Sequence, residues 1–186
     1  SDAVQAAGKV PFDLASSGAD MISLSAHKLG GPKGVGALTL RQGVTVEPLI
    51  KGGGQERRRR AGTENVSGIV GFGVAAELAS AGLGKAAEIG KLRDELEARA
   101  VSIAPDRIVF SANVARLPNT SAFAVPGTKA ETLLIGLDLA GVAVSSGSAC
   151  SSGKVEASHV LKAMGIAPEL SRSALRVSLG PDTTKV

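Results

Sequence analysis

The sequence predicts an α/β protein, because short strands and helices alternate along the chain. Residues 174–180, ALRVSLG, carry apolar residues at every second position, which is typical of a strand with one buried face. Apolar residues at spacings of three and four predict a long amphipathic helix; they are Ile89, Leu92, Leu96, Ala100 and Ile103. Strands and helices interleaved in this way indicate α/β or α+β architecture.

The first part of the chain contains two predicted strands. DMISLS, at residues 20–25, predicts a short buried strand that ends at His27 and Lys28. GVGALTL, at residues 34–40, predicts a second strand bounded by glycines. Lys28 therefore follows directly on a strand.

The next segment predicts a loop and then a helix. Residues 46–65 combine three consecutive glycines with the cationic run ERRRR, which is typical of a loop. A helical pattern follows, and Gly82 and Gly84 interrupt it. We place a domain boundary here, between residues 1–83 and residues 84–186.

The second part of the chain predicts a compact domain. After Pro105 we expect short strands in RIVF and TSAFAV, and then a helix in KAETLLIGLDLA. Thr128 and Glu131 form a capping-box pattern at the start of that helix, and Gly141 ends it. A further helix is expected over about residues 156–164, before the strand ALRVSLG.

Composition narrows the class of protein. Hydrophobic residues make up 44% of the chain, enough for a core, which with four Phe and no Trp or Tyr consists of Val, Ile, Leu and Ala. The net charge of +4 is mild, and no unbroken apolar run approaches the roughly 18 residues that span a bilayer. The single cysteine excludes an internal disulfide, which is typical of a reducing, cytosolic setting.

Lys28 is the first candidate for chemistry. Four glycines within the next eight residues let the backbone approach a ligand closely. A lysine in such a place can form a Schiff base once its amine has lost a proton. Ser25 and His27 offer donors suited to a phosphate, and Lys33 adds positive charge. The alternative is an ordinary surface lysine.

Asp2 and Gln5 become informative only beside a ring cofactor. A carboxylate against a pyridine nitrogen keeps that nitrogen protonated and makes the ring an electron sink. Gln5 can hydrogen-bond an oxygen of the same ring. Without a ring nearby, both are solvated polar residues.

Cys150 lies in the segment SSGSACSSG, residues 145–153. Serines and glycines on both sides make burial on an apolar face unexpected for this thiol. Gly147 and Gly153 would permit a loop that carries the thiol from one position to another. The alternative is a small buried cysteine without a chemical role.

Arg176 lies in the predicted strand ALRVSLG, between Leu175 and Val177. Its guanidinium loses hydration there unless it meets an anion, and a substrate carboxylate fits its two-pronged geometry. An outward-facing arginine on an edge strand is the alternative. His159 is expected to be a surface or packing residue, and no HExxH or CxxC spacing occurs, so we expect no metal site.

Six segments together resemble the pyridoxal-phosphate-dependent cysteine desulfurases of the class V aminotransferase family, in the branch of nitrogenase-associated and housekeeping iron–sulfur enzymes. They are DAVQAAGK, SLSAHKLGGPKGVGAL, GGGQERRRRAGT, LPNTS, SSGSACSSG and ALRVSLG, in the family order and at near-family spacing. The resemblance covers essentially the whole chain and corresponds to the C-terminal half of a family member. It implies a fold-type I α/β transferase: residues 1–83 would end the large cofactor-binding domain, and residues 84–186 would form the small C-terminal domain with a mobile cysteine loop.

The resemblance also implies roles for individual residues. Lys28 resembles the lysine that holds pyridoxal phosphate as a Schiff base. Cys150 resembles the nucleophile that takes sulfur from L-cysteine as a persulfide and leaves L-alanine. Asp2 resembles the partner of the ring nitrogen, and Gln5 resembles the partner of the ring oxygen. Ser25 and His27 resemble the phosphate ligands. Thr63 resembles the threonine that reaches the phosphate bound by the other subunit. Arg176 resembles the clamp on the substrate carboxylate, and Asn119, in LPNTS, is assigned to substrate binding with it.

The family pattern further implies a cytoplasmic homodimer with shared active sites that passes sulfur to an acceptor such as an iron–sulfur scaffold protein. Gly30 stands where many relatives carry an aromatic residue, so packing after Lys28 is expected to differ. The N-terminal part of the family, with its ring-stacking histidine and its phosphate loop, does not occur in this sequence. We therefore expect these 186 residues alone to be inactive.

Other functions fit parts of the sequence. A related class V aminotransferase or a selenocysteine lyase would share the fold, although an aminotransferase has no use for Cys150. A non-enzymatic phosphate- or nucleic-acid-binding module around KGGGQERRRR predicts affinity that falls steeply with salt. The lack of aromatic residues for base stacking disfavours it, and we expect neither a nucleic-acid nor a membrane partner.

Overall fold

The computed structural model describes residues 1–146 and 158–185. The chain divides into two compact units, Ser1–Gly84 and Lys85–Val186. The assignment of these units to a large cofactor-binding domain and a small C-terminal domain stays a prediction.

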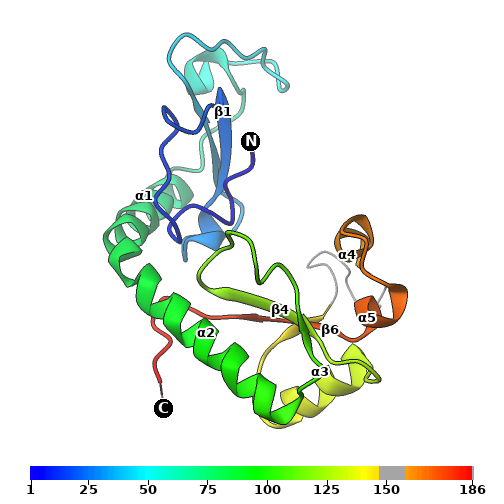
Figure 1. The fold of residues 1–186 in the computed structure, drawn as a ribbon. Coiled ribbons are helices and arrows are strands. Elements are labelled where there is room, and N and C mark those ends of the chain that lie inside the picture. Colours follow the sequence, from blue (N-terminus) through cyan, green and yellow to red (C-terminus); the bar gives the residue numbers. More distant parts are fainter. Residues whose placement is uncertain (147–157, 186) are drawn as a thin grey trace. The chain divides into compact units, whose positions relative to one another are not determined.

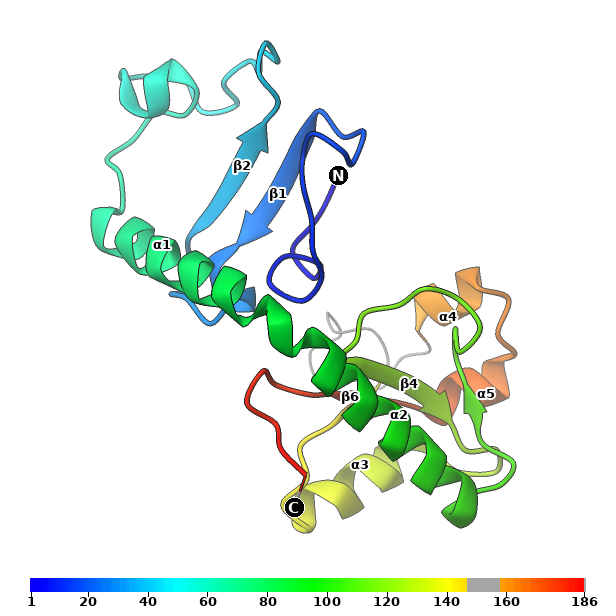
Figure 2. The same cartoon turned by 60° about the vertical axis from the view of Figure 1, so that its left-hand side comes forward.

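The first unit is built on a two-stranded antiparallel sheet of β1 (Met21–Ser25) and β2 (Gly36–Leu40), which lie side by side in Figure 2. The short 3-10 helix η1 (Ala26–Lys28) follows β1 directly, as the sequence predicted for the strand that precedes Lys28. A parallel bridge joins Asp2 to Ser23 of β1. The first residues of the chain therefore run beside β1 in the same direction.

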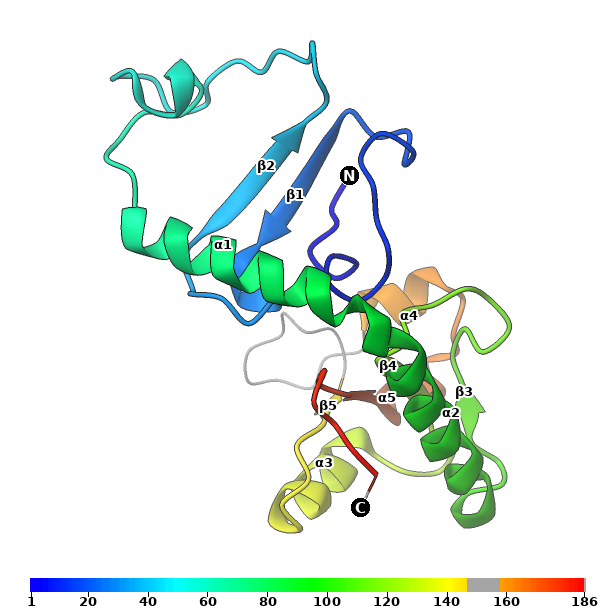
Figure 3. The same cartoon turned by 90° about the vertical axis from the view of Figure 1, so that its left-hand side faces the viewer.

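Helix α1 (Val66–Ala81) lies along this sheet, as Figures 2 and 3 show, and packs with its small residues. Asn65 caps the helix by accepting the N–H of Gly68 at 3.1 Å. A Cβ at Gly71 would lie 2.7 Å from Pro32, closer than real Cβ contacts allow. Glycine weakens the helical pattern in the sequence, but at Gly71 it allows α1 to pack closely against the segment after Lys28.

The outer face of α1 is apolar as well. Large side chains there are about half exposed or more; they are Val66, Ile69, Val70, Val74 and Leu78. By length and composition alone, the helical segment Val66–Ile103 could cross a membrane, with a mean hydropathy of 1.6 in an 18-residue window. No such segment was expected from the sequence, which has no unbroken apolar run of that length. Because a helix that is apolar all round is also typical of a protein core, the absence of a membrane partner stays a prediction.

The short 3-10 segment η2 (Gln55–Arg58) has unusual backbone geometry. Glu56, Arg57 and Arg58 have φ values of 47°, 56° and 64°, in the left-handed region that costs a residue with a Cβ about 1–2 kcal/mol. We expect Arg58→Gly to raise the free energy of unfolding by about 1 kcal/mol, because relief of strain exceeds the added entropy of the unfolded chain.

The measurement for Arg58→Gly is the urea midpoint of unfolding. Arg59→Gly is the matched control, because Arg59 has an ordinary φ of −89° and glycine there adds only unfolded-state entropy. A midpoint that falls equally in both variants would contradict strain at Arg58.

The second unit contains a four-stranded antiparallel sheet in the order β3-β4-β6-β5. Its strands are β3 (Ile108–Val109), β4 (Thr120–Ala124), β5 (Ser145–Ser146) and β6 (Ala174–Ser178). The predicted strands TSAFAV and ALRVSLG form the central pair, which lie side by side in Figure 1. The predicted strand RIVF is reduced to two residues.

Helices cover both faces of this sheet. They are α2 (Ala86–Ile103), α3 (Ala130–Leu139), α4 (His159–Ala163) and α5 (Pro168–Arg172). Ser121 of β4 contacts α2, whereas Ala124 packs with Leu161 of α4. Because residues three apart on a strand point to opposite faces, α2 and α4 lie on different sides of the sheet. Figures 1 and 3 likewise place α3 and α4 on opposite sides of β4 and β6.

Two local predictions in this unit need correction. The capping box at Thr128 and Glu131 is wrong, because the N-cap is Lys129 and the Thr128 hydroxyl donates to the carbonyl of Val125 at 2.7 Å. The helix expected over about 156–164 is described from His159, and α5 after it was not predicted from the sequence. Gly82 and Gly84 interrupt the α-helical pattern as expected, in the 3-10 segment η3 (Gly82–Lys85).

Candidate active site

The residues predicted to bind a cofactor gather at one end of β1. Ser1–Ala3 runs parallel to β1, and the chain then makes a helical turn in which Ala7 N–H donates to the Ala3 carbonyl at 2.9 Å. This turn follows the carboxyl end of Ser1–Ala3, and His27 and Lys28 follow the carboxyl end of β1. Ligands of α/β sheets bind outside such carboxyl ends, so the topology brings these residues into one candidate site.

Lys28 and His27 lie on a tight turn. Ala26 between them and β1 is fully buried, and its carbonyl accepts the N–H groups of Leu29 and Gly31, both at 2.9 Å. Both side chains that follow, His27 and Lys28, are exposed. A rigid backbone therefore presents the amine and the imidazole outward.

Ser25 and His27 are already paired. The Ser25 Oγ lies 2.8 Å from His27 Nδ1. Since the hydroxyl has both a donor and two lone pairs, this contact leaves capacity for a further ligand. The geometry of the pair fits a phosphate ligand, and its role in binding phosphate stays a prediction.

Asp2 has one carboxylate oxygen fixed by the backbone. Its Oδ1 accepts the N–H of Val4 at 2.8 Å, and no hydrogen bond to Oδ2 occurs within the described residues. A carboxylate held in this way has one oxygen available for a protonated ring nitrogen. The residues present at this end of the sheet therefore fit a pyridoxal phosphate ligand.

Lys9 is a member of the cluster that the sequence analysis missed. Its Nζ donates to Gln5 Oε1 at 2.6 Å. Partial burial, and after it the charge of Lys28, lower the pKa of Lys9. The signal in the sequence was the spacing of four in QAAGK, which places Gln5 and Lys9 on one side of a helical turn.

Thr63 lies in the same unit, two residues before Asn65, the N-cap of α1, and its side chain is exposed. Its predicted contact with a phosphate of the other subunit stays a prediction.

Arg176 and Asn119 belong to the second unit. Arg176 is half-buried on β6, opposite Ala122 of β4 and Ser145 of β5. Ser145 begins the segment that contains Cys150, which lies outside the described residues. The predicted substrate clamp is therefore adjacent to the base of the cysteine segment. Within the described chain no acidic side chain pairs with Arg176, so its guanidinium has capacity for an external carboxylate.

Asn119 is engaged in contacts within the protein. Its side-chain Nδ2 donates to the carbonyl of Leu179 at 3.2 Å, and the N–H of Leu179 donates to the main-chain carbonyl of Asn119 at 2.8 Å. The side chain thereby joins the ends of β4 and β6. These contacts give Asn119 a structural role, and its assignment to substrate binding stays a prediction.

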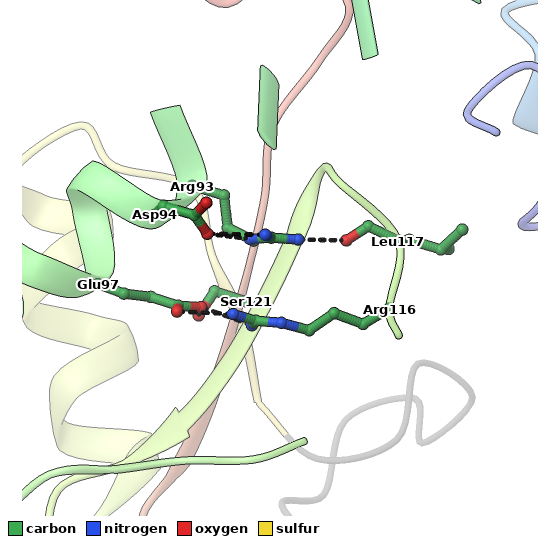
Figure 4. A network of polar contacts seen from close by, with 6 residues as sticks. All are labelled: Arg93, Asp94, Glu97, Arg116, Leu117 and Ser121. Carbon is green, nitrogen blue, oxygen red and sulfur yellow. Dashed lines mark hydrogen bonds and ion pairs between the residues drawn. The ribbon is translucent and has the colours of Figure 1, made fainter. Parts of the chain in front are cut away.

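A partly buried polar network holds the segment that contains Asn119 on helix α2 (Figure 4). Arg116 donates two hydrogen bonds to Glu97, at 2.6 and 2.7 Å, and the Ser121 hydroxyl donates to Glu97 Oε1 at 2.6 Å. Arg93 donates to the carbonyl of Leu117 at 2.8 Å. The hydrogen bond from Arg116 holds the pKa of Glu97 below its ordinary value, and the same contact raises that of Arg116.

The fold, with Lys28 at the end of β1, is that of an α/β transferase. The Aminotransferase class-V family profile matches residues 1–186, and the chain belongs to this family. The predicted fold-type I α/β class is confirmed. Among the described residues no group of three or more His, Cys, Asp or Glu could hold a metal ion.

Two of the similar curated proteins are cysteine desulfurases. The chain is 51% identical over 183 residues to the cysteine desulfurase of Cereibacter sphaeroides, which covers 98% of this chain and 47% of the relative. It is 48% identical over 185 residues to the cysteine desulfurase NifS of Azotobacter vinelandii, with coverages of 99% and 46%. The chain thus spans about half the length of the curated relatives it matches.

Solved structures agree with these relatives. A NifS-like protein from Rickettsia africae superimposes with a TM-score of 0.86 at 40% identity, over 98% of this chain and 48% of that one. A structure described as SspA in complex with cysteine superimposes with a TM-score of 0.73 at 32% identity, over 97% of this chain and 49% of that one.

Proposed function

We propose that the full-length protein carrying this chain is a pyridoxal-phosphate-dependent cysteine desulfurase, which converts L-cysteine to L-alanine and keeps the sulfur as a persulfide on Cys150. The observation that carries the proposal is the pairing of Arg176 with Ser145, because a carboxylate clamp at Arg176 would then lie beside the start of the segment that contains Cys150, the one cysteine of these 186 residues. The matched relatives, which are cysteine desulfurases, support it.

Each residue has a defined task in this proposal. Pyridoxal phosphate, when bound, supplies an electron sink for chemistry at the α-carbon of an amino acid. Lys28 would hold its aldehyde carbon and carry a proton at Nζ, Asp2 would bind the ring nitrogen, and Ser25 with His27 would bind phosphate. Arg176 would orient the substrate through its carboxylate, and Cys150 Sγ would receive the sulfur atom.

The proposal extends to the protein's setting. A cytoplasmic homodimer, in which Thr63 reaches the phosphate of the other subunit, would hand its sulfur to an acceptor such as an iron–sulfur scaffold protein. The exposed position of Thr63 leaves it accessible to a second subunit. A related aminotransferase is the alternative within the family.

Cys150→Ser in the full-length protein separates the two activities. We expect release of alanine from L-cysteine to fall to the level seen without enzyme, because the hydroxyl of serine does not accept sulfur as a thiolate does. Binding of pyridoxal phosphate, followed by visible absorption, should stay at the wild-type level. Transamination of amino acids that is unchanged in Cys150→Ser, with no alanine released from L-cysteine by either protein, would favour the aminotransferase.

A further inference from the structure

Lys9 lies at the candidate site without a task in the proposed reaction. Its side chain is half-buried on the turn beside β1, and its Nζ lies 2.6 Å from Gln5 Oε1. Backbone hydrogen bonds fix that turn: Val10 N–H donates to the Ala6 carbonyl at 3.1 Å, and Ala3 N–H donates to the Ser23 carbonyl at 3.1 Å. The contact between the two side chains therefore rests on a backbone that is tied to β1.

The chemistry of the contact sets the orientation of the Gln5 amide. An ammonium group has three donors and no acceptor, so the atom of Gln5 that it meets must be the carbonyl oxygen. The NH₂ group of Gln5 is thereby left for another partner. An NH₂ group attracts an anionic oxygen, whereas the flipped amide would present its own carbonyl oxygen and repel it.

The position of Lys9 also has an electrostatic consequence. Lys9 is close enough to Lys28 for the charge of Lys28 to lower its pKa, after the larger effect of burial. Two cations at one end of the sheet raise the local positive potential and favour an anionic ligand there. A half-buried ammonium needs an acceptor to offset its lost hydration, and Gln5 Oε1 supplies one.

We propose that Lys9 is a positioning residue, which fixes the Gln5 amide so that its NH₂ group donates to the anionic ring oxygen of bound pyridoxal phosphate. The inference rests on the proposed function, because it assumes that pyridoxal phosphate is the cofactor bound at this site. In this proposal Lys9 strengthens binding of the cofactor by orienting Gln5, and not by contacting the phosphate.

The test compares two ligands in the full-length protein. Lys9→Met removes the donor and keeps the apolar stem. We expect it to weaken binding of pyridoxal phosphate about tenfold, the loss of one charge-assisted hydrogen bond. Binding of 3-deoxypyridoxal phosphate, which lacks the ring oxygen, should be unchanged. Equilibrium dialysis measures both dissociation constants, and Lys91→Met, an exposed lysine on α2, is the control for loss of charge.

Two further variants make the test specific. Lys9→Arg keeps a donor and should restore most of the affinity for pyridoxal phosphate. Gln5→Met combined with Lys9→Met should cost no more than Gln5→Met alone, because both act through one amide. An equal loss for both ligands, or no loss for either, overturns the proposal. A wild-type protein that binds the cofactor but releases no alanine refutes the desulfurase function and leaves the Lys9 measurement valid.

Discussion

Lys28→Ala in the full-length protein is expected to remove both the visible absorption given by bound pyridoxal phosphate and the release of alanine from L-cysteine. Lys28 is exposed on the turn after β1, next to Lys9 and to the Ser25–His27 pair. Alanine has no amine to bond the cofactor aldehyde, and it removes the group that carries the proton at the α-carbon. An absorption spectrum and an assay for alanine measure the two losses.

Two matched variants separate covalent chemistry from charge. Lys28→Arg keeps a cation but cannot form the bond to the aldehyde, so it should lose the band as Lys28→Ala does. Lys91→Ala removes an exposed lysine of α2 and should keep both properties. A visible band that persists in Lys28→Ala and is fixed by borohydride would show that another amine holds the cofactor, and Lys9 would be the first to examine.

Local features of this chain could be predicted from its sequence because they depend on neighbouring residues. The strand expected at 20–25 is β1, Met21–Ser25, and the alternating segment ALRVSLG is β6. The spacing of three and four after Gly84 gives α2, in which Ile89 is buried. In each case the period of the apolar residues is enough to choose between strand and helix.

Features that depend on distant residues were not predicted. Glu97 and Arg116 are 19 residues apart and meet only because β4 packs on α2. No local pattern marks either residue as buried. The capping box failed for a related reason: Thr128 has a nearer acceptor in the carbonyl of Val125, and Ser/Thr hydroxyls readily make such local bonds.

The site shows the same division. The sequence motifs named Lys28 and its neighbours, but only the parallel pairing of Asp2 with Ser23 explains why residues more than twenty positions apart share one end of a sheet. Lys9 was missed because its significance depends on a hydrogen bond to Gln5 and on the nearby charge of Lys28, which lowers its pKa after the larger effect of burial. A motif identifies residues, and tertiary structure adds the partners that orient them.

Glu97→Ala is expected to lower the free energy of unfolding by about 1.5–3 kcal/mol, because it leaves the partly buried Arg116 guanidinium without the carboxylate that accepts its hydrogen bonds. The side chains of Arg116 and Glu97 are only 17% and 13% exposed, so water replaces the lost contacts poorly. The Ser121 hydroxyl, on a residue that is 2% exposed, loses its acceptor as well. Urea unfolding of the full-length protein measures the change.

Asp182→Ala is the control, because it breaks the ion pair of Lys85 and Asp182, whose side chains are 58% and 89% exposed. Exposed pairs contribute about 0–1 kcal/mol, so this variant should stay near wild type. Glu97→Ala combined with Arg116→Ala should recover part of the loss, since no buried charge is then left unpaired. Equal, small changes in Glu97→Ala and Asp182→Ala would contradict a buried network.

The same pair predicts how stability depends on pH. Because Arg116 holds the pKa of folded Glu97 below the ordinary value of 4.5, the folded state binds fewer protons than the unfolded state between these two values. The contribution of Glu97 is therefore complete above pH 4.5 and declines as the pH falls through the lowered pKa. Urea midpoints of wild type and Glu97→Gln should differ most at neutral pH and converge in acid. A difference that stays constant from neutral pH into acid would mean that the network is held by shape and not by the charge of Glu97.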